Sequence, residues 1–462
     1  MKKKIWITIM AAALTLGMLT GCGDAGAASG EMTQTDVDSE AGADTESNSV
    51  ADDTKETESS ESAENSEGTD SSQGAEISES AGSSMEETEP ELEIPEVNIA
   101  PQEIPDTEAF TFVHDMKIGW NLGNTFDAFR ESPFANELES ETQWVGVATT
   151  QEMIDDIQEA GFNSIRIPVT WHPHVDENYQ ISETWLNRVQ EVVDYAYNNG
   201  MYVILNIHHD NSKEFMYPST EYLEQSVNYV TTIWQQLAER FKEYDQHLIF
   251  ESMNEPRQVG TAWEWGLSGN AECKDAIACI NEINQAFVDT VRATGGNNQN
   301  RYLMIPGYDA SCDGVMHSGF VLPTDAEGVK DKLIVSVHAY TPYSFALQAE
   351  GESGSSSVFD SDAAWYTTEI NTFMNKLYNK FIKEGVPVVI GEFGSRDKSS
   401  NTQSRIDHAT YYIAAARARG MSCFWWDNNA FTGSGELFGI YNRRDGYFVY
   451  PEIISALMKY AD

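Results

Sequence analysis

The chain has 462 residues, of which 41% are hydrophobic, and its 74 acidic and 28 basic residues give a formal net charge of −46. So few basic residues argue against nucleic-acid binding, which needs clustered Lys and Arg to neutralise phosphates. About 25 of these negative charges lie between Cys22 and Glu108, so the net charge overstates the acidity of the rest of the chain.

The N-terminus has the features of an export signal. Lysines at positions 2–4 precede an apolar run at residues 5–19, which is too short for a stable membrane span. The run ends in Leu19-Thr20-Gly21-Cys22, which resembles the lipobox of bacterial lipoproteins. The resemblance implies that residues 1–21 are removed, and that lipid on Cys22 anchors the protein at the extracellular face of a bacterial cell envelope. The alternative is an ordinary secreted protein in which Cys22 has no such role.

Residues 22–105 have the composition of a disordered acidic tether. The segment consists mostly of Ser, Glu, Asp, Thr, Ala and Gly, with almost no aromatic residues. Such a composition cannot bury a core, and like charges keep the chain extended. We therefore expect a spacer between the anchor and a folded domain.

Residues 106–462 are rich in aromatic residues and contain no further low-complexity break, which predicts one large domain. Its cysteines are Cys273, Cys279, Cys312 and Cys423. None forms a C-x-x-C pair, so a metal knuckle is not expected, and the sequence leaves their disulfide state open.

Short apolar runs alternate with amphipathic stretches along this domain. The runs predict strands at residues 116–122, 164–169, 202–207, 248–252, 302–305, 333–337, 387–390 and 421–426. Helical patterns include residues 151–159, 183–198, 226–244 and 275–293. Eight alternations favour a closed (β/α)₈ TIM barrel of the α/β class over an open doubly wound sheet.

Polar residues lie near or directly after the carboxyl-terminal ends of six of these strands, where such barrels place their active sites. They are Arg166, then His208 and His209, then Asn254 and Glu255, then His338 and Tyr340, then Glu392, and finally the segment 425–429. One polar residue after a strand is common, but six sets at one face indicate a site.

Glu255 and Glu392 are the candidate catalytic pair. Glycoside hydrolysis needs one carboxylic acid to protonate the leaving oxygen and one carboxylate to attack or to activate water. Pro256 fixes the backbone after Glu255, and Gly391 allows close backbone approach before Glu392. The sequence does not give the distance between the two carboxyl groups, so it leaves retention and inversion open.

From about residue 117 onward the chain resembles glycoside hydrolase family 5, most closely its endo-β-1,4-glucanase branch from anaerobic bacteria. The resemblance is carried by GWNLGNT at 119–125, IRIPV at 165–169, NIHH at 206–209, NEP at 254–256, HAY at 338–340, GEF at 391–393 and WDN at 426–428. It implies a retaining endoglucanase acting on cellulose-type or mixed-linkage β-glucan. Xyloglucan, mannan or xylan is the alternative substrate, and an oligosaccharide-binding lipoprotein without activity is a remote one.

The resemblance also implies individual roles. Glu255 would be the acid/base and Glu392 the nucleophile. Residues around them would orient the nucleophile or bind sugar: Arg166, Tyr340, Asn254, His208 and His338. His209 is a further substrate-binding candidate, and Asn124, in the first strand-end loop, either binds an outer sugar or only shapes the turn. A strand-eight tryptophan would stack on the reacting sugar, and Trp425 is preferred to Trp426. Neither a cofactor nor a metal is implied, and we expect a monomer.

Overall fold

The structure is a computed structural model, and it describes residues 92–130, 132, 134–399 and 401–462. The predicted signal peptide, Cys22 and the predicted tether up to residue 91 lie outside these ranges. The folded part is one compact unit.

Eight parallel strands close into a barrel in chain order, β1 to β8. They are β1 (Ile118–Leu122), β2 (Ser164–Ile167), β3 (Tyr202–Asn206), β4 (Leu248–Glu251), β5 (Leu303–Pro306), β6 (Leu333–His338), β7 (Val388–Phe393) and β8 (Ser422–Asp427). A short antiparallel pair follows, β9 (Tyr441–Asn442) and β10 (Tyr447–Phe448). All eight predicted strands are present, and the (β/α)₈ barrel is confirmed.

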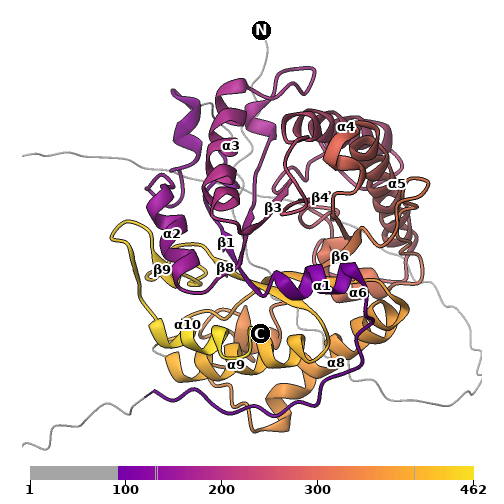
Figure 1. The fold of residues 1–462 in the computed structure, drawn as a ribbon. Helices are drawn as coiled ribbons and strands as arrows, with labels where there is room; N and C mark the ends of the chain where they lie inside the picture. The colour runs from indigo at the N-terminus through magenta and orange to yellow at the C-terminus, as the bar shows by residue number, and fades with distance from the viewer. Residues whose placement is uncertain (1–91, 131, 133, 400) are drawn as a thin grey trace, which may run out of the picture. The chain divides into compact units, whose positions relative to one another are not determined.

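The helices surround the barrel (Figure 1). They are α1 (Glu108–Asp115), α2 (Gln151–Glu159), α3 (Glu183–Asn198), α4 (Leu223–Arg240), α5 (Ala271–Ala293), α6 (Cys312–Met316), α7 (Tyr343–Ala346), α8 (Ala364–Lys380), α9 (Thr402–Arg417) and α10 (Pro451–Met458). Helices α2 and α3 have the predicted bounds. Helix α5 begins earlier than predicted because the Asn270 side chain caps it by accepting a hydrogen bond from the Cys273 N–H. No helix in the described ranges is long and apolar enough to cross a membrane.

The interior of the barrel is layered. An apolar layer lies toward the amino-terminal ends of the strands and consists of Ile204, Ile249, Met304, Ile334, Val389 and Phe424. Helix α1 packs on this layer and closes that end of the barrel, with the Phe112 ring stacked 3.8 Å from the ring of Tyr302. Two residues further along the strands, the same inward face carries polar residues, because strand side chains alternate between faces. The site therefore rests on a rigid apolar floor.

Residues 92–105 lie on the catalytic domain, although their composition led us to include them in the tether. The Val97 N–H donates to the Tyr460 hydroxyl at 2.7 Å, and the Tyr378 hydroxyl donates to the Glu103 carbonyl at 2.9 Å. Ile94 and Ile104 pack against the core. In Figure 1 this segment, coloured indigo, runs alongside α8 and α9. The compositional boundary at residue 105 is therefore too late, because scattered isoleucines and valines suffice to dock an extended segment.

The four cysteines of the described domain are unpaired. Cys273, Cys279 and Cys423 are buried, and Cys312 is partly buried. Burial raises the pKa of the Cys312 thiol to about 11, so it is protonated at neutral pH.

Candidate active site

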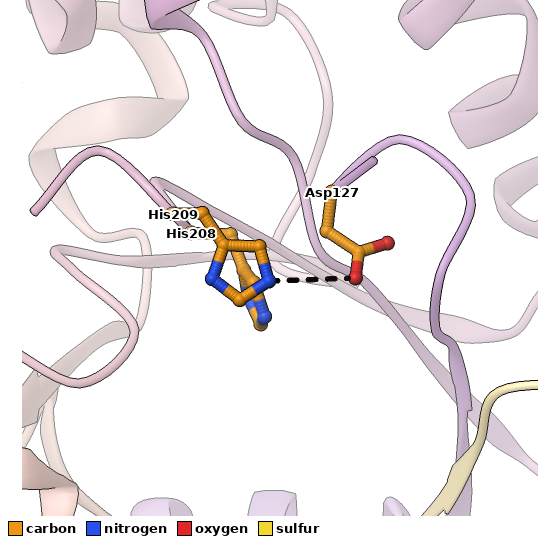
Figure 2. Close-up of side chains that lie close together, drawn as sticks. All are labelled: Asp127, His208 and His209. Atoms are coloured by element: carbon orange, nitrogen blue, oxygen red, sulfur yellow. Dashed lines mark ion pairs between the residues drawn. The ribbon is translucent and has the colours of Figure 1, made fainter. Parts of the chain in front are cut away.

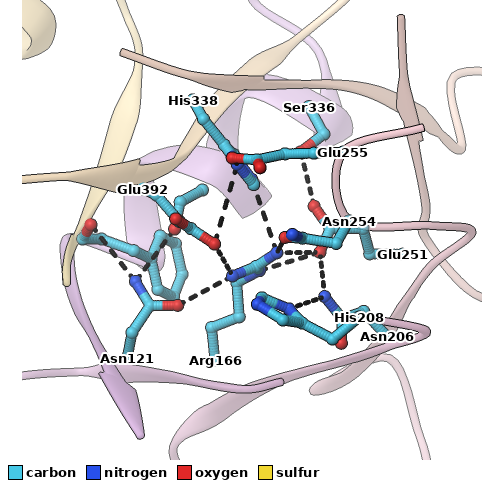
Figure 3. Close-up of polar contacts among 12 residues, drawn as sticks. Asn121, Arg166, Asn206, His208, Glu251, Asn254, Glu255, Ser336, His338 and Glu392 are labelled. Atoms are coloured by element: carbon cyan, nitrogen blue, oxygen red, sulfur yellow. Dashed lines mark hydrogen bonds and ion pairs between the residues drawn. The ribbon is translucent and has the colours of Figure 1, made fainter. Parts of the chain in front are cut away.

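Arg166 is the centre of a polar network at the carboxyl-terminal end of the strands (Figure 3). It lies on β2, is fully buried, and reaches partners on four other strands or their ends. Its Nε donates to Oε2 of Glu251 at 2.8 Å and its Nη1 to Oε1 of Glu392 at 2.7 Å. Its Nη2 also donates to Oδ1 of Asn254 at 2.7 Å and lies 3.4 Å from Nε2 of His338, and its Nη1 donates to Oδ1 of Asn121 at 3.0 Å. Two carboxylates compensate the cost of burying the guanidinium, and their charges raise its pKa further.

Glu392 points into the barrel because β7 is irregular at this position. The register between β7 and β8 shifts between Ile390 and Phe393, and His338 on β6 pairs with Glu392 after a second shift. Val389 faces inward, so strict alternation would turn Glu392 outward; the irregularity turns it inward. A Cβ on Gly391 would lie 3.1 Å from Nε2 of His338, which explains the glycine. Tyr340 donates its hydroxyl to Oε2 of Glu392 at 2.9 Å.

Glu255 lies close to Glu392, and His338 touches both. Nδ1 of His338 is 2.9 Å from Oε1 of Glu255 and 3.7 Å from Oε1 of Glu392. The ligand-type atoms of these three residues all lie within 4.8 Å of one another. Carboxyl groups of retaining glycosidases are about 5–5.5 Å apart, whereas inverting enzymes separate them by about 6.5–9.5 Å. The spacing is that of a retaining pair.

The pKa values of Glu255 and His338 are both shifted from their ordinary values. Burial raises the pKa of Glu255, but the hydrogen bond and charge of His338 and the charge of Arg257 outweigh it and lower this pKa to about 2. Burial lowers the pKa of His338, but the charge of Glu392 and the bond to Glu255 raise it above its ordinary value. In the free protein the proton shared by Glu255 and His338 therefore rests on the imidazole.

Trp426, and not Trp425, faces the site. Phe424 and Trp426 share the inward face of β8, and the Trp426 indole lies parallel to the His208 ring at 5.8 Å. Trp425 points outward, is fully buried, and donates its indole N–H to the Phe438 carbonyl at 3.2 Å. The preference for Trp425 is therefore corrected: alternation along the strand places Trp425 among the core side chains, where no sugar can reach it.

His208 and His209 follow β3 and lie beside Asp127 (Figure 2). Nε2 of His209 is 3.9 Å from Oδ2 of Asp127, whose two oxygens accept the backbone N–H groups of Asn124 and Thr125. Burial lowers the pKa of His209 to about 4, so it is neutral at pH 7. Asn124 has a left-handed backbone, with φ of 59°, and shapes this turn.

This cluster offers metal-ligand types, with the ligand atoms of Asp127, His208 and His209 within 4.8 Å of one another. Zinc ligands lie about 2.0–2.2 Å from the ion, and the 3.9 Å between Nε2 of His209 and Oδ2 of Asp127 is compatible with a shared ion. The Asp127 carboxylate and Nδ1 of His208 are already hydrogen-bonded within the protein. The expectation that catalysis uses no metal stays a prediction.

Sequence reasoning did not identify Glu251 or Asn206 as part of the network. Glu251 is fully buried on β4, where Oε1 accepts from Ser336 at 2.5 Å and Oε2 accepts from Asn206 at 3.1 Å. A signal was present: each residue lies two positions after an inward apolar residue of the same strand, Ile249 and Ile204. Side chains on one face of a strand recur every two residues, so counting two residues from each apolar position toward the carboxyl end of the strand identifies both.

Aromatic faces match the apolar faces of sugar rings, so four further tryptophans of the domain are either stacking or packing residues. Trp171 is fully buried and belongs to the core. Trp144 is 42% exposed, and its ring lies 5.9 Å from that of His209. Trp265 is 66% exposed and is covered on one face by the Arg257 guanidinium at 4.0 Å, while Trp263 donates to Glu272. Of these four, Trp144 and Trp265 are the most exposed and so are available for contact with a sugar.

A carboxylate pair at retaining distance, with one member held by an arginine and a tyrosine at the active end of a (β/α)₈ barrel, defines a glycoside hydrolase. The sequence profile of the family described as cellulase, glycosyl hydrolase family 5, matches residues 127–432. Endoglucanase 1 of Ruminococcus albus is 44% identical over 359 residues, which cover 77% of this chain and 82% of that protein. The chain belongs to glycoside hydrolase family 5.

Other comparisons agree. Cellulase/esterase CelE of Acetivibrio thermocellus is 43% identical over 357 residues, although the match spans only 40% of that longer protein. Among solved structures, a family 5 lichenase from Caldicellulosiruptor sp. F32 is 56% identical, with a TM-score of 0.80 over 80% of this chain and all of that one. A broad-specificity endoglucanase from Ruminococcus champanellensis, solved with bound cellotriose, is 43% identical with a TM-score of 0.70 over 77% of this chain and all of that one.

Proposed function

We propose that this chain is a retaining endo-β-1,4-glucanase that hydrolyses cellulose-type and mixed-linkage β-glucans. The observation that carries the proposal is the approach of the Glu255 and Glu392 carboxylates to within 4.8 Å. The relatives support the substrate class, since they are named endoglucanases and a lichenase. The mechanism follows from the two glutamates and their partners.

In the first step Glu392 attacks the anomeric carbon, and Glu255 gives its proton to the glycosidic oxygen, which leaves as a sugar hydroxyl. This produces a covalent glycosyl-enzyme. In the second step Glu255, now ionised, takes a proton from water, whose oxygen attacks the anomeric carbon and releases Glu392. Each step inverts the anomeric carbon, because the incoming group attacks opposite the leaving group, so the two steps together retain the configuration.

The network prepares Glu392 for attack. Arg166 and Tyr340 each bind one of its oxygens, which favours the ionised form and fixes the direction of the attacking lone pair. Asn254 accepts from Arg166 through Oδ1, so its amide N–H₂ is the group that can donate to a substrate. We assign that amide to the 2-hydroxyl of the reacting sugar, and the Trp426 face to stacking on its ring.

Glu255 must carry a proton when substrate is bound, whereas in the free protein that proton rests on His338. The 2.9 Å contact provides the transfer path: Nδ1 of His338 releases the proton to Oε1 of Glu255. The glycosidic oxygen, once bound beside Glu255, accepts it in turn. His338 thereby acts as the proton store of the acid/base.

Hydrolysis rates on carboxymethyl cellulose, barley β-glucan, xyloglucan, mannan and xylan, measured side by side, test the substrate class. We expect the two unbranched glucans to be cleaved fastest, with random internal cleavage seen as a rapid fall in viscosity. Faster hydrolysis of xyloglucan, mannan or xylan would replace the proposed substrate with that polymer.

We further propose that the enzyme acts from the extracellular face of the bacterial envelope, held by lipid on Cys22. The support is the sequence alone: a basic start, an apolar run and Leu19-Thr20-Gly21-Cys22, followed by the acidic segment. Residues 22–91 would let the catalytic domain reach polymer outside the cell.

A further inference from the structure

Trp265 lies in the loop after β4, the loop that begins near Glu255, and it is 66% exposed. One face of its indole is covered by the guanidinium of Arg257, whose Cζ lies 4.0 Å from the ring centroid. Single exposed apolar side chains are common on protein surfaces, so exposure alone indicates no function. The neighbours of this tryptophan, however, connect it to the acid/base.

Arg257 makes that connection. Its Nη1 donates to the Glu255 carbonyl at 3.1 Å and lies 3.5 Å from Oε2 of the Glu255 carboxylate. Its Nε is 3.6 Å from Oε1 of Glu264. An arginine can serve the indole and the carboxylate together, because its flat face stacks on an aromatic ring while the N–H groups at its edge point toward acceptors. A single side chain therefore separates Trp265 from the acid/base.

The loop that carries Trp265 is held in place by hydrogen bonds. The hydroxyl of Tyr308, in the loop after β5, donates to the Trp263 carbonyl at 2.7 Å and accepts from the Gln258 N–H at 3.2 Å. Trp263 donates its indole N–H to Glu272 at 2.8 Å and is only partly exposed. Trp263 is thus a packing residue of this loop, whereas Trp265 presents an open aromatic face.

The leaving group of the proposed reaction lies on the Glu255 side of the catalytic pair. Glu255 gives its proton to the oxygen that departs, so the sugar that carries this oxygen must lie beside Glu255. The Glu255 side chain is 18% exposed, so a substrate can reach it. The apolar face of a glucose ring matches an aromatic face. Trp265 offers such a face to solvent next to the arginine that contacts Glu255.

We propose that a sugar of the leaving group stacks on Trp265, and that Arg257 positions this indole relative to Glu255. The inference rests on the proposed function and names a binding residue for the departing half of the glucan. The sugars that stay on Glu392 in the covalent intermediate lie on the other side of the cleaved bond. The effect of Trp265 is therefore confined to substrates whose leaving group is a sugar.

The test compares two substrates that have the same two sugars before the cleaved bond. Cellotetraose cleaved at its central bond has cellobiose as its leaving group, whereas β-cellobiosyl fluoride releases fluoride, which cannot stack. Trp265→Ala is expected to lower kcat/KM for central cleavage of cellotetraose about threefold to tenfold more than kcat/KM for the fluoride, the size expected for a lost stacking contact. Trp265→Tyr keeps an aromatic face and is expected to restore most of the ratio.

Arg257→Lys tests the positioning role. It keeps a positive charge near Glu255 but lacks the flat group that covers the indole. The ratio of the two kcat/KM values is expected to fall in the same direction as in Trp265→Ala, and the double variant should show no further fall, because both changes remove one stacking face. A loss of folded enzyme does not change this ratio, since both substrates are measured on one protein. Fully additive falls would show that Arg257 does not position Trp265.

Trp365→Ala is the matched control, because Trp365 is 84% exposed but lies on α8, outside the loop after β4. Its ratio should equal that of the wild type. An unchanged ratio in Trp265→Ala, or an equal fall on both substrates, would overturn the proposal and leave Trp265 a surface residue. If the wild type cleaves neither substrate, the proposed function itself fails, which is a distinguishable result.

Discussion

Nδ1 of His338 lies 2.9 Å from Oε1 of Glu255, so the acid/base and the imidazole titrate as a pair. The negative charge of Glu392 favours a proton on this pair. Acid catalysis needs that proton, and His338 is where the free protein keeps it. The pH dependence of the reaction should therefore be set by the pair and not by Glu255 alone.

The fall of kcat/KM at high pH, the alkaline limb of the pH profile, tests this coupling. The pKa of His338 is raised above its ordinary 6.5, so the pair loses its proton, and activity falls, only as pH rises above that value. In His338→Gln the proton must be held by Glu255 alone, whose pKa burial raises and the charge of Arg257 lowers, so the limb should move away from its wild-type position. The control His247→Gln changes a histidine outside the site, whose side chain contacts Asp245 and Tyr202. An unmoved limb in His338→Gln would refute the pairing.

Trp426 and Trp425 should respond in opposite ways to truncation. Trp426→Ala removes the sugar-stacking face, and we expect kcat/KM on cellotetraose to fall by about tenfold or more while the fold is kept. Trp425→Ala opens a cavity in the core and should lower the free energy of unfolding by about 3–5 kcal/mol. Denaturant unfolding and steady-state kinetics on both variants provide the measurement. The reverse pattern would restore Trp425 as the stacking residue.

Glu251→Ala should weaken both stability and activity. It leaves Arg166 with one carboxylate instead of two, and breaking a buried ion pair costs about 3–5 kcal/mol of unfolding free energy. Because Arg166 orients Glu392, kcat should fall as well. Glu183→Ala is the control, since that glutamate is 75% exposed and pairs with Arg240 at the surface. Wild-type kcat in Glu251→Ala would show that Arg166 needs no second partner.

Cys22→Ser tests the anchor. A serine cannot accept the thioether-linked lipid, so the variant should leave the membrane fraction and collect in the medium, with unchanged specific activity. Fractionation followed by an activity assay gives the result. Equal membrane association of wild type and variant would argue for a different mode of attachment, and a wild type found only in the medium would argue for simple secretion.

The sequence predicted the barrel because buried parallel strands and amphipathic helices differ in period and length, and all eight strands alternate with helical segments. The strand ends also identified the glutamates, Arg166, His338 and Tyr340, which the structure brings together. These predictions depended only on position along a strand.

Predictions that depended on side-chain direction were less successful. The choice of Trp425 ignored the inward direction that Phe424 sets for β8. The inward turn of Glu392 requires a register shift, which no local residue pattern specifies. Glu251 was missed because a carboxylate inside an apolar strand indicates no function by itself. Its role becomes clear only when its buried partner, Arg166, is known. The end of the tether was misplaced because packing of residues 92–105 depends on a distant surface.

The central claim is that Glu392 forms a covalent bond to the sugar. Incubation with 2,4-dinitrophenyl 2-deoxy-2-fluoro-β-cellobioside, followed by peptide mass spectrometry, tests it directly, because the fluorine slows the second step and the activated leaving group speeds the first. The account predicts one fluorocellobiosyl group on Glu392, time-dependent loss of activity, and no labelling in Glu392→Gln. Label on another residue, or an active enzyme that takes up no label, would contradict it.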